Sequence, residues 1–174
     1  MSNALENRRP NGPENAIELH SGKEPWQDSE WQRLWLAVER QPWRSLALVP
    51  AGEGASLDFT LIVALTLSRT GMVHVGSPLQ VADATNVSLS QLTAFCNEVS
   101  RCTSSGQRLI VALPPVGSSA VPISIAQVVD AAVLCVLADK MTAAQSKQTI
   151  KLVGRTRFIG SAIFHPRHID QATR

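Results

Sequence analysis

The sequence predicts an α/β domain in three layers, a mostly parallel sheet with helices on both faces. Short and nearly continuous apolar segments recur along the chain, as expected of strands that are buried on both faces. Segments with helical periodicity or helix caps separate them, which is typical of a covered parallel sheet. A chain of 174 residues, 44% of them hydrophobic, suits about one domain with its own core.

The first expected helix begins near residue 29. Ser29-Glu30-Trp31-Gln32 resembles a capping box, and Trp31, Leu34, Trp35 and Val38 follow at helical spacing. This stripe predicts an amphipathic helix that packs on the domain. Aromatic side chains are favoured both in cores and at interfaces. Trp31 and Trp35 are therefore predicted core residues or, alternatively, a docking surface for a protein partner.

Strands and helices alternate through the rest of the chain. Strands are expected at 45–49, 72–75, 81–84, 108–112, 131–138 and 157–164. Helices are expected at 61–71, ending at Gly71, from 88 to about 99, and at 142–154. Ser88-Leu89-Ser90-Gln91 has the pattern of a capping box for the second of these.

The two ends of the chain differ in composition from its middle. Residues 1–27 are rich in Asn, Pro, Gly and Glu and predict a disordered leader, whereas 165–174 are polar and predict a frayed tail. The domain itself is expected at 28–164. No signal peptide and no apolar run of about 18 residues is visible, so a cytoplasmic location is expected.

Charge and cysteine content exclude several classes of function. The formal net charge is +2 with scattered Lys and Arg, which does not favour nucleic acid as a partner. Cys96, Cys102 and Cys135 form neither a disulfide framework nor a C-x-x-C metal pair, so we expect small core residues. His165 and His168 have Pro166 between them and no further ligand at zinc spacing, so no metal site is expected.

A glycine-containing loop follows the strand expected at 45–49. Ala51-Gly52-Glu53-Gly54-Ala55-Ser56 lies between a predicted strand and a predicted helix, as a phosphate-binding Walker A loop does. In such a loop, main-chain N–H groups cradle phosphates, a lysine neutralises them and a hydroxyl holds Mg²⁺. Gly52, Gly54 and Ser56 match, but Ala55 stands in the lysine position. An ordinary strand-to-helix turn is the alternative explanation of the two glycines.

Three segments resemble the bacterial tyrosine kinases of polysaccharide biosynthesis (CpsD/CapB-like), a branch of the MinD/ParA P-loop ATPase superfamily. The loop 51–56 resembles that family's P-G-E-G-K-S. Residues 109–116, Leu-Ile-Val-Ala-Leu-Pro-Pro-Val, resemble its Walker B strand ending in I-D-T-P-P. Residues 125–136 are similar to its short helix followed by L-V-D-G-V-L-L-V-V. The resemblance covers about 43–164 and implies a reduced P-loop fold.

The departures from the family concern its catalytic residues. Ala112 stands where the family has the Walker B aspartate, and Leu113 where it has threonine. Asp83 is the residue of this chain that corresponds, by a weak similarity only, to the family's second aspartate segment. No lysine lies between Lys23 and Lys140, and the chain has no tyrosine, so tyrosine autophosphorylation is excluded.

The resemblance and its departures together imply a catalytically inactive pseudo-ATPase or pseudokinase. Such a protein would be an accessory, regulatory or scaffold component of exopolysaccharide biosynthesis or secretion. Its implied partner is a membrane-embedded polysaccharide synthase or copolymerase, which would bring it to the inner membrane. No cofactor is expected beyond residual ATP or ADP at Gly52, Glu53, Gly54, Ala55 and Ser56.

Three alternatives to this interpretation stay open. A nucleotide-binding switch or ATPase of MinD/ParA type, acting in spatial positioning through a non-standard site, would need a lysine in trans, or Lys140 brought to the loop by folding. The loop could instead form the interface of a homodimer or homo-oligomer. Glu53 and Asp58 could form an acid pair for hydrolysis, although carboxylates are expected at a helix start simply because of the helix dipole.

Overall fold

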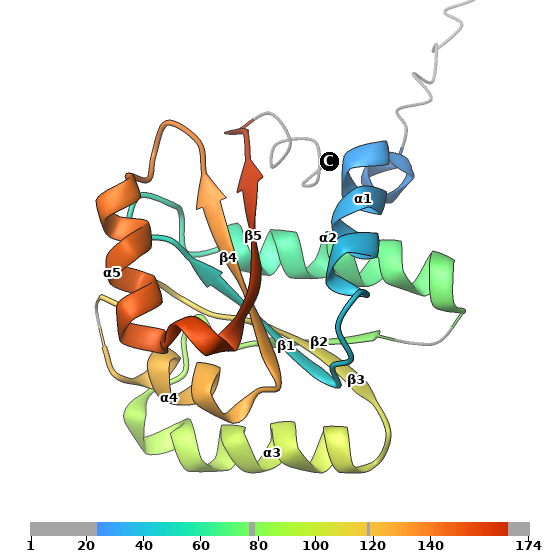
Figure 1. Cartoon of the computed structure of the whole chain (residues 1–174). Helices are drawn as coiled ribbons and strands as arrows, with labels where there is room; N and C mark the ends of the chain where they lie inside the picture. Colours follow the sequence, from blue (N-terminus) through green and yellow to red (C-terminus); the bar gives the residue numbers. More distant parts are fainter. Residues whose placement is uncertain (1–23, 77–78, 118, 167–174) are drawn as a thin grey trace, which may run out of the picture.

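The computed structural model describes residues 24–76, 79–117 and 119–166 (Figure 1). The helices are α1 (Ser29–Val38), α2 (Phe59–Val75), α3 (Leu92–Ser104), α4 (Val121–Val128) and α5 (Ala143–Val153). The strands are β1 (Ser45–Pro50), β2 (Leu79–Asp83), β3 (Arg108–Ala112), β4 (Ala131–Leu137) and β5 (Phe158–Phe164). Single 3-10 turns are η1 (Pro25–Gln27), η2 (Leu89–Gln91) and η3 (Arg155–Arg157). None of the described helices is long and apolar enough to cross a membrane.

Within these residues the five strands form one parallel sheet in the order β2-β3-β1-β4-β5. The chain runs from β1 through α2 to the β2 edge and then returns in the opposite direction. Because crossovers between parallel strands are right-handed, a reversal of direction moves the connecting helix to the other face of the sheet. Accordingly α1 and α2 pack on one face, whereas α3, α4 and α5 pack on the other. The predicted α/β class is confirmed.

Alternate residues of the strands contribute to two cores, one on each face of the sheet. Leu46 and Leu48 of β1 point to the α1–α2 side, and Ala47 and Val49 point to the opposite side. All six residues of β1 are buried, as expected for a strand in the middle of a covered parallel sheet.

The α1–α2 core is rich in aromatic side chains. Trp31 and Phe59 each pack against Phe164, with ring centroids 5.6 Å apart in both pairs. Trp35 meets Trp43 edge to face at 6.2 Å. Trp31 is 6% exposed and Trp35 1%, so both indoles belong to the core, as one of the two sequence interpretations expected.

A network of charged and aromatic groups holds the amino ends of the strands. The Asp130 carboxylate, just before β4, accepts hydrogen bonds from the main-chain N–H groups of Arg44 and Ser45 at 2.8 and 2.9 Å, and from the Ser45 hydroxyl. Burial opposes its ionisation, but these hydrogen bonds outweigh burial and lower its pKa. Arg108 stacks on Trp43 at 3.8 Å and forms an ion pair with Glu39.

One element differs from the prediction. Residues 72–75 are not a strand but the last turn of α2, which ends at Gly76 in the left-handed conformation. Gly71, taken as the helix end, is internal, and a Cβ there would collide with Leu79 and with the Trp35 ring. Its glycine is thus explained by close packing of α1, α2 and β2 rather than by a chain reversal.

Two helix starts show how local side chains set the boundaries. For α1 the capping residue is Asp28, whose carboxylate accepts from the Glu30 N–H at 2.7 Å, so the Ser29 capping box is wrong by one residue. Before α3, Ser88 and Gln91 form the predicted capping box around η2.

Cys135 lies in the centre of β4 and is fully buried. Burial raises the pKa of its thiol, because the thiolate would lose its hydration. Cys102 is also buried and Cys96 partly so, in agreement with the prediction of small core residues.

The leader and tail predictions fall almost entirely on residues outside the described ranges. Of 1–27, the structure describes 24–27, which include the turn η1, and of 165–174 it describes 165 and 166. His168 therefore also lies outside the described residues.

Candidate functional site

The carboxyl ends of the strands carry the predicted phosphate loop. The β1–α2 loop turns to one face of the sheet, whereas the β3–α4 and β4–α5 loops turn to the other. Such a point of divergence, outside the carboxyl ends of parallel strands, is where open α/β sheets bind ligands. The candidate site is therefore defined by these three loops together with the β2–α3 loop.

The β1–α2 loop is longer than a Walker A loop, because α2 begins later in the chain than a Walker A helix would. The N–H of Ala51 donates to the Cys135 carbonyl at 2.9 Å, and the Ala51 carbonyl accepts from the Thr149 hydroxyl at 3.2 Å. These two bonds fix the start of the loop to β4 and α5. α2 begins only at Phe59, so Ser56 precedes the helix by three residues instead of opening it.

Close packing explains both glycines of the loop. A Cβ at Gly54 would collide with the carbonyl oxygen of Lys140, which belongs to the β4–α5 loop. A Cβ at Gly52 would lie 2.9 Å from side-chain carbons of Gln145 on α5. The loop thus lies directly against its neighbours, and glycine is the residue that permits this approach.

Lys140, the first lysine after Lys23 in the sequence, is consequently a neighbour of the phosphate-loop position. It follows Asp139, whose φ of 63° is unusual for a residue other than glycine. Thr142 and Gln145 form a capping box that starts α5 directly after it. Folding therefore brings the main chain of Lys140 to Gly54, while its side chain is exposed.

The end of β3 is apolar where a metal-binding carboxylate would be needed. Ala112 and Leu113 are fully buried, and each faces one of the two cores. The Leu113 carbonyl accepts a 2.7 Å hydrogen bond from the buried Thr60 hydroxyl of α2. This position contributes main-chain contacts and packing but no ionisable group.

Asp83 ends β2, two strands away from β1. Its carboxylate accepts from the N–H and the hydroxyl of Thr85 at 2.9 and 2.6 Å, which forms a local turn. The carboxylate is therefore engaged with its own loop.

Two hollows flank the loop, and Glu53 lines both. One, of about 410 Å³, also includes Ala55, Thr85 and Pro114. The other, of about 320 Å³, lies between the loop and α5 and includes Gly117 and Gln145. The Glu53 side chain reaches from the β1–α2 loop to the β3–α4 loop. One of its carboxylate oxygens is 2.7 Å from the position that a Cβ at Gly117 would take.

The residues that line these hollows include one carboxylate. Neither hollow is lined by Lys or Arg among the described residues, whereas both contain the Glu53 carboxylate. Phosphate sites in this kind of loop combine main-chain N–H groups with a cation.

The predicted site residues thus lie together. Gly52, Glu53, Gly54, Ala55 and Ser56 form one loop at the carboxyl edge, as expected. Glu53 faces the hollows, whereas Asp58 precedes α2 without a side-chain capping bond, so the two share no hydrogen bond in the described contacts. Gln145 and Gly117 were not predicted as site residues, since nothing in their local sequence indicates a contact with a loop so distant along the chain.

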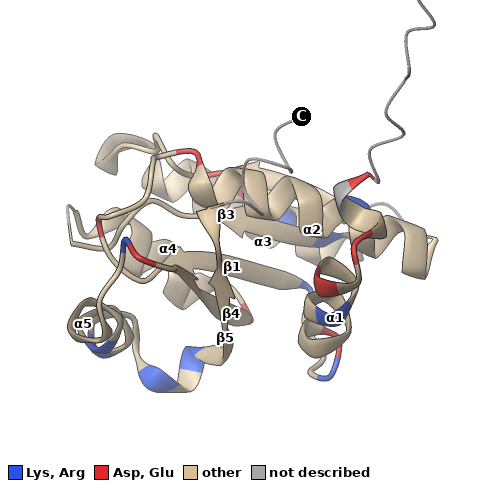
Figure 2. Ribbon diagram, turned by 90° about the horizontal axis from the view of Figure 1, so that it is seen from above, with Lys and Arg blue, Asp and Glu red and all other residues tan. Residues whose placement is uncertain are grey.

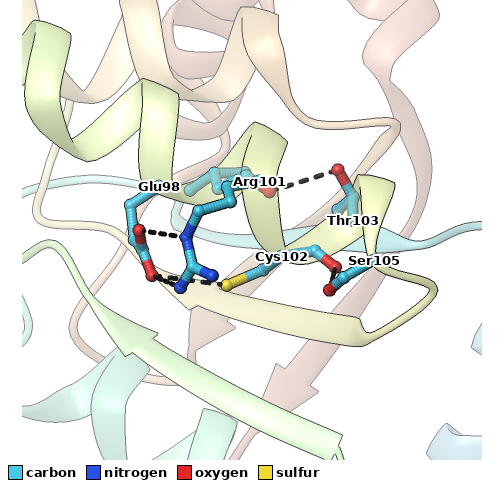
Figure 3. A network of polar contacts seen from close by, with 6 residues as sticks. Glu98, Arg101, Cys102, Thr103 and Ser105 are labelled. Carbon is cyan, nitrogen blue, oxygen red and sulfur yellow. Dashed lines mark hydrogen bonds and ion pairs between the residues drawn. The ribbon is translucent and has the colours of Figure 1, made fainter.

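A second polar cluster lies on α3, outside this site (Figure 3). Glu98 and Arg101 form a 2.5 Å ion pair, which lowers the pKa of the carboxyl chiefly through the hydrogen bond from the guanidinium. The Cys102 thiol donates to the same carboxylate at 3.6 Å, and the Ser105 hydroxyl donates to the Cys102 carbonyl. These contacts join neighbours on one helix and its end, so they stabilise α3 locally.

Comparisons with known proteins bear on the fold. No protein-family model matches the chain, and no curated protein matches its sequence. Among solved structures, the chimerical protein CapA2B2 is similar, with a TM-score of 0.62 over 84% of this chain and 87% of that chain. The sequence identity is 12%, so the likeness concerns the arrangement of helices and strands. It agrees with the α/β fold, a parallel sheet between helices, that was expected from the sequence.

Proposed function

We propose that this chain is a catalytically inactive accessory or scaffold protein of bacterial exopolysaccharide biosynthesis or secretion. The observation that carries the proposal is the pair Ala55 and Ala112, which leaves the loop without a cation and β3 without a carboxylate. The expected activity is binding of a protein partner rather than phosphoryl transfer.

The physical argument concerns charge. Phosphoryl transfer depends mainly on positioning and on stabilising negative charge on the transferring group, which a loop lysine and Mg²⁺ provide. In this chain Glu53 lies in the hollows instead, and a carboxylate repels a triphosphate. Loss of both the lysine and the metal-binding carboxylate removes the two largest favourable contributions together.

The pathway in this proposal comes from the sequence resemblance to polysaccharide-biosynthesis kinases. The partner would be a membrane-embedded polysaccharide synthase or copolymerase, which would hold the chain at the inner membrane. Deletion of the gene should reduce secreted polysaccharide, and a copy with Ala55→Lys should restore it as well as the unchanged gene does. Unchanged polysaccharide in the deletion strain would overturn the pathway assignment.

Calorimetric titration with ATP and ADP, with and without Mg²⁺, tests the absence of a nucleotide site. We expect no saturable heat, whereas an intact P-loop ATPase gives a binding curve under the same conditions. Micromolar Mg²⁺-dependent binding that Gly54→Arg abolishes would overturn the proposal.

The second candidate is a nucleotide-binding switch or ATPase of MinD/ParA type. It is favoured by one observation, the packing of the Lys140 main chain against Gly54, which brings a lysine to the loop from another part of the chain. This candidate requires nucleotide binding that Lys140→Ala abolishes and that Lys147→Ala, a matched change farther along α5, leaves intact. Binding insensitive to both changes would argue against it.

A further inference from the structure

The strand β5 forms an open edge of the sheet. It pairs with β4 on one side, and no described strand lies on its other side. Edge strands are commonly protected by charged residues or proline, but Phe158–Phe164 contains neither. Ile163 is 67% exposed. The edge therefore offers main-chain hydrogen-bonding groups and an apolar side chain to a partner.

A hollow of about 610 Å³ runs beside this edge, between β5 and α5. Its apolar lining comes from both elements and from β4: Leu134, Ile150, Phe158 and Ile159. Two exposed cationic residues, Lys147 of α5 and Arg155 of η3, also line the hollow. The surface is thus an apolar depression with cations beside it.

Further cations lie on α5 and directly after it. Lys147 and Lys151 are one helical turn apart on α5, Arg155 follows in η3, and no ion pair within the described ranges involves them. Between Lys140 and Arg157 the chain contains neither Asp nor Glu. In Figure 2 the ribbon is blue, the colour of Lys and Arg, at positions on α5 and in the turn that leads into β5. The helix dipole accounts for cations near the end of α5, but not for Lys147 in its middle.

We propose that an acidic, extended segment of a partner protein docks here as an additional strand on β5. Its main chain would pair with the open edge, its apolar side chains would enter the hollow, and its carboxylates would meet Lys147 and Arg155. A lipid surface could not use the main-chain groups of the edge, and the concave shape does not suit a flat membrane. The surface is separate from the β1–α2 loop, so this inference goes beyond the proposed function.

Fluorescence anisotropy with labelled synthetic peptides tests the proposal on the full chain. A peptide of alternating Glu and Val should bind saturably, and the same peptide with Lys in place of Glu should not. Two further versions of the Glu peptide carry N-methyl groups on alternate main-chain nitrogens, one version for each edge of the extended peptide. Both keep the side chains, and the version methylated on the edge that pairs with β5 should not bind. Binding should also slow hydrogen exchange of β5 amides.

Variants of the protein locate the site. Lys147→Glu and Arg155→Glu should each weaken binding of the Glu peptide by about 3- to 10-fold. Lys151→Glu is the matched control, because it makes the same charge change on α5, where Lys147 also lies, but at a residue that does not line the hollow. Its effect should stay below about 2-fold.

Several results would overturn the proposal. The first is that the Lys peptide binds as tightly as the Glu peptide. The second is that Lys151→Glu weakens binding as much as Lys147→Glu does. The third is that no binding occurs at millimolar peptide and that hydrogen exchange of the β5 amides is unchanged. Binding of anionic phosphatidylglycerol vesicles that all three variants weaken equally, without peptide binding, would assign the surface to a membrane. A dimeric mass that Ile163→Lys converts to a monomer would assign it to a second copy of the chain.

Discussion

At the amino ends of the strands, Asp130 and Arg108 hold the chain through charged hydrogen bonds and ring stacking, whereas at the carboxyl ends Gly52 and Gly54 let loops contact each other directly. One end is held by charged side chains, whereas the other depends on two glycines and on the uncharged Thr149 hydroxyl. The difference teaches that a loop at the carboxyl ends of a parallel sheet can be held by close packing, without a charged side chain. Four substitutions sharpen this comparison.

The largest effect is expected from Gly54→Ala at the carboxyl end. The added methyl group would collide with the Lys140 carbonyl, and such overpacking against main chain costs about 1–3 kcal/mol of unfolding free energy. Urea denaturation measures the loss. Gly160→Ala is the matched control, since nothing lies within 4 Å of a Cβ there. Equal stability of the two variants would contradict the packing account.

Asp130→Asn tests the amino end. Loss of the charged acceptor should reduce stability by about 1–2 kcal/mol at neutral pH, toward the lower value because the residue is exposed. The pKa of Asp130 is lowered in the folded state, so its contribution is full above the unfolded-state pKa and is lost as pH falls through the folded-state value. Stability of the unchanged protein should therefore decrease on acidification more than that of the variant. Asp58→Asn is the control, because the Asp58 carboxylate makes no capping bond. It should leave the stability at neutral pH, and the decrease in stability on acidification, nearly as in the unchanged protein.

Thr149→Val removes the hydroxyl that donates to the Ala51 carbonyl at the start of the loop. The side chain is buried and its shape is kept, so about 1 kcal/mol should be lost. Thermal unfolding compared with Thr156→Val, which changes an exposed threonine, measures the difference. A larger effect at Thr156 would show that this bond does not hold the loop.

The smallest effect on stability is expected from Ala55→Lys, because Ala55 borders an open hollow. The free energy of unfolding should change by less than about 0.5 kcal/mol. Calorimetry with Mg²⁺ and ATP should still show no binding, since the end of β3 has no carboxylate. Strong binding by this single variant would show that the missing lysine alone determines the difference between the chain and an active ATPase.

Sequence periodicity predicted the buried strands and the capped helices well, because both signals are local. The segments 45–49, 108–112 and 131–138 correspond closely to β1, β3 and β4. The wrong strand prediction at 72–75 arose because Gly71 was interpreted as a helix end. Residue 71 is glycine because a larger side chain would collide with Trp35. A glycine needed for packing and a glycine that ends a helix look the same in one sequence.

The candidate site was predicted only in part for the same reason. The loop 51–56 follows from its glycines and its place after a strand. Its contacts with Lys140 and Gln145 join residues about ninety positions apart, and they follow only from the pairing of β1 with β4. Whether Trp31 and Trp35 were core or interface residues likewise depended on what α1 covers.

The three cysteines give the protein a built-in scale of solvent access. Cys96 is partly exposed on α3, Cys102 is buried near the end of that helix, and Cys135 is enclosed in the middle of the sheet with a raised thiol pKa. A thiol-specific alkylating reagent should therefore modify them in that order. Modification of Cys102 reports opening of α3 alone, and modification of Cys135 requires separation of β4 from its neighbours, so one mass spectrum distinguishes local from global unfolding.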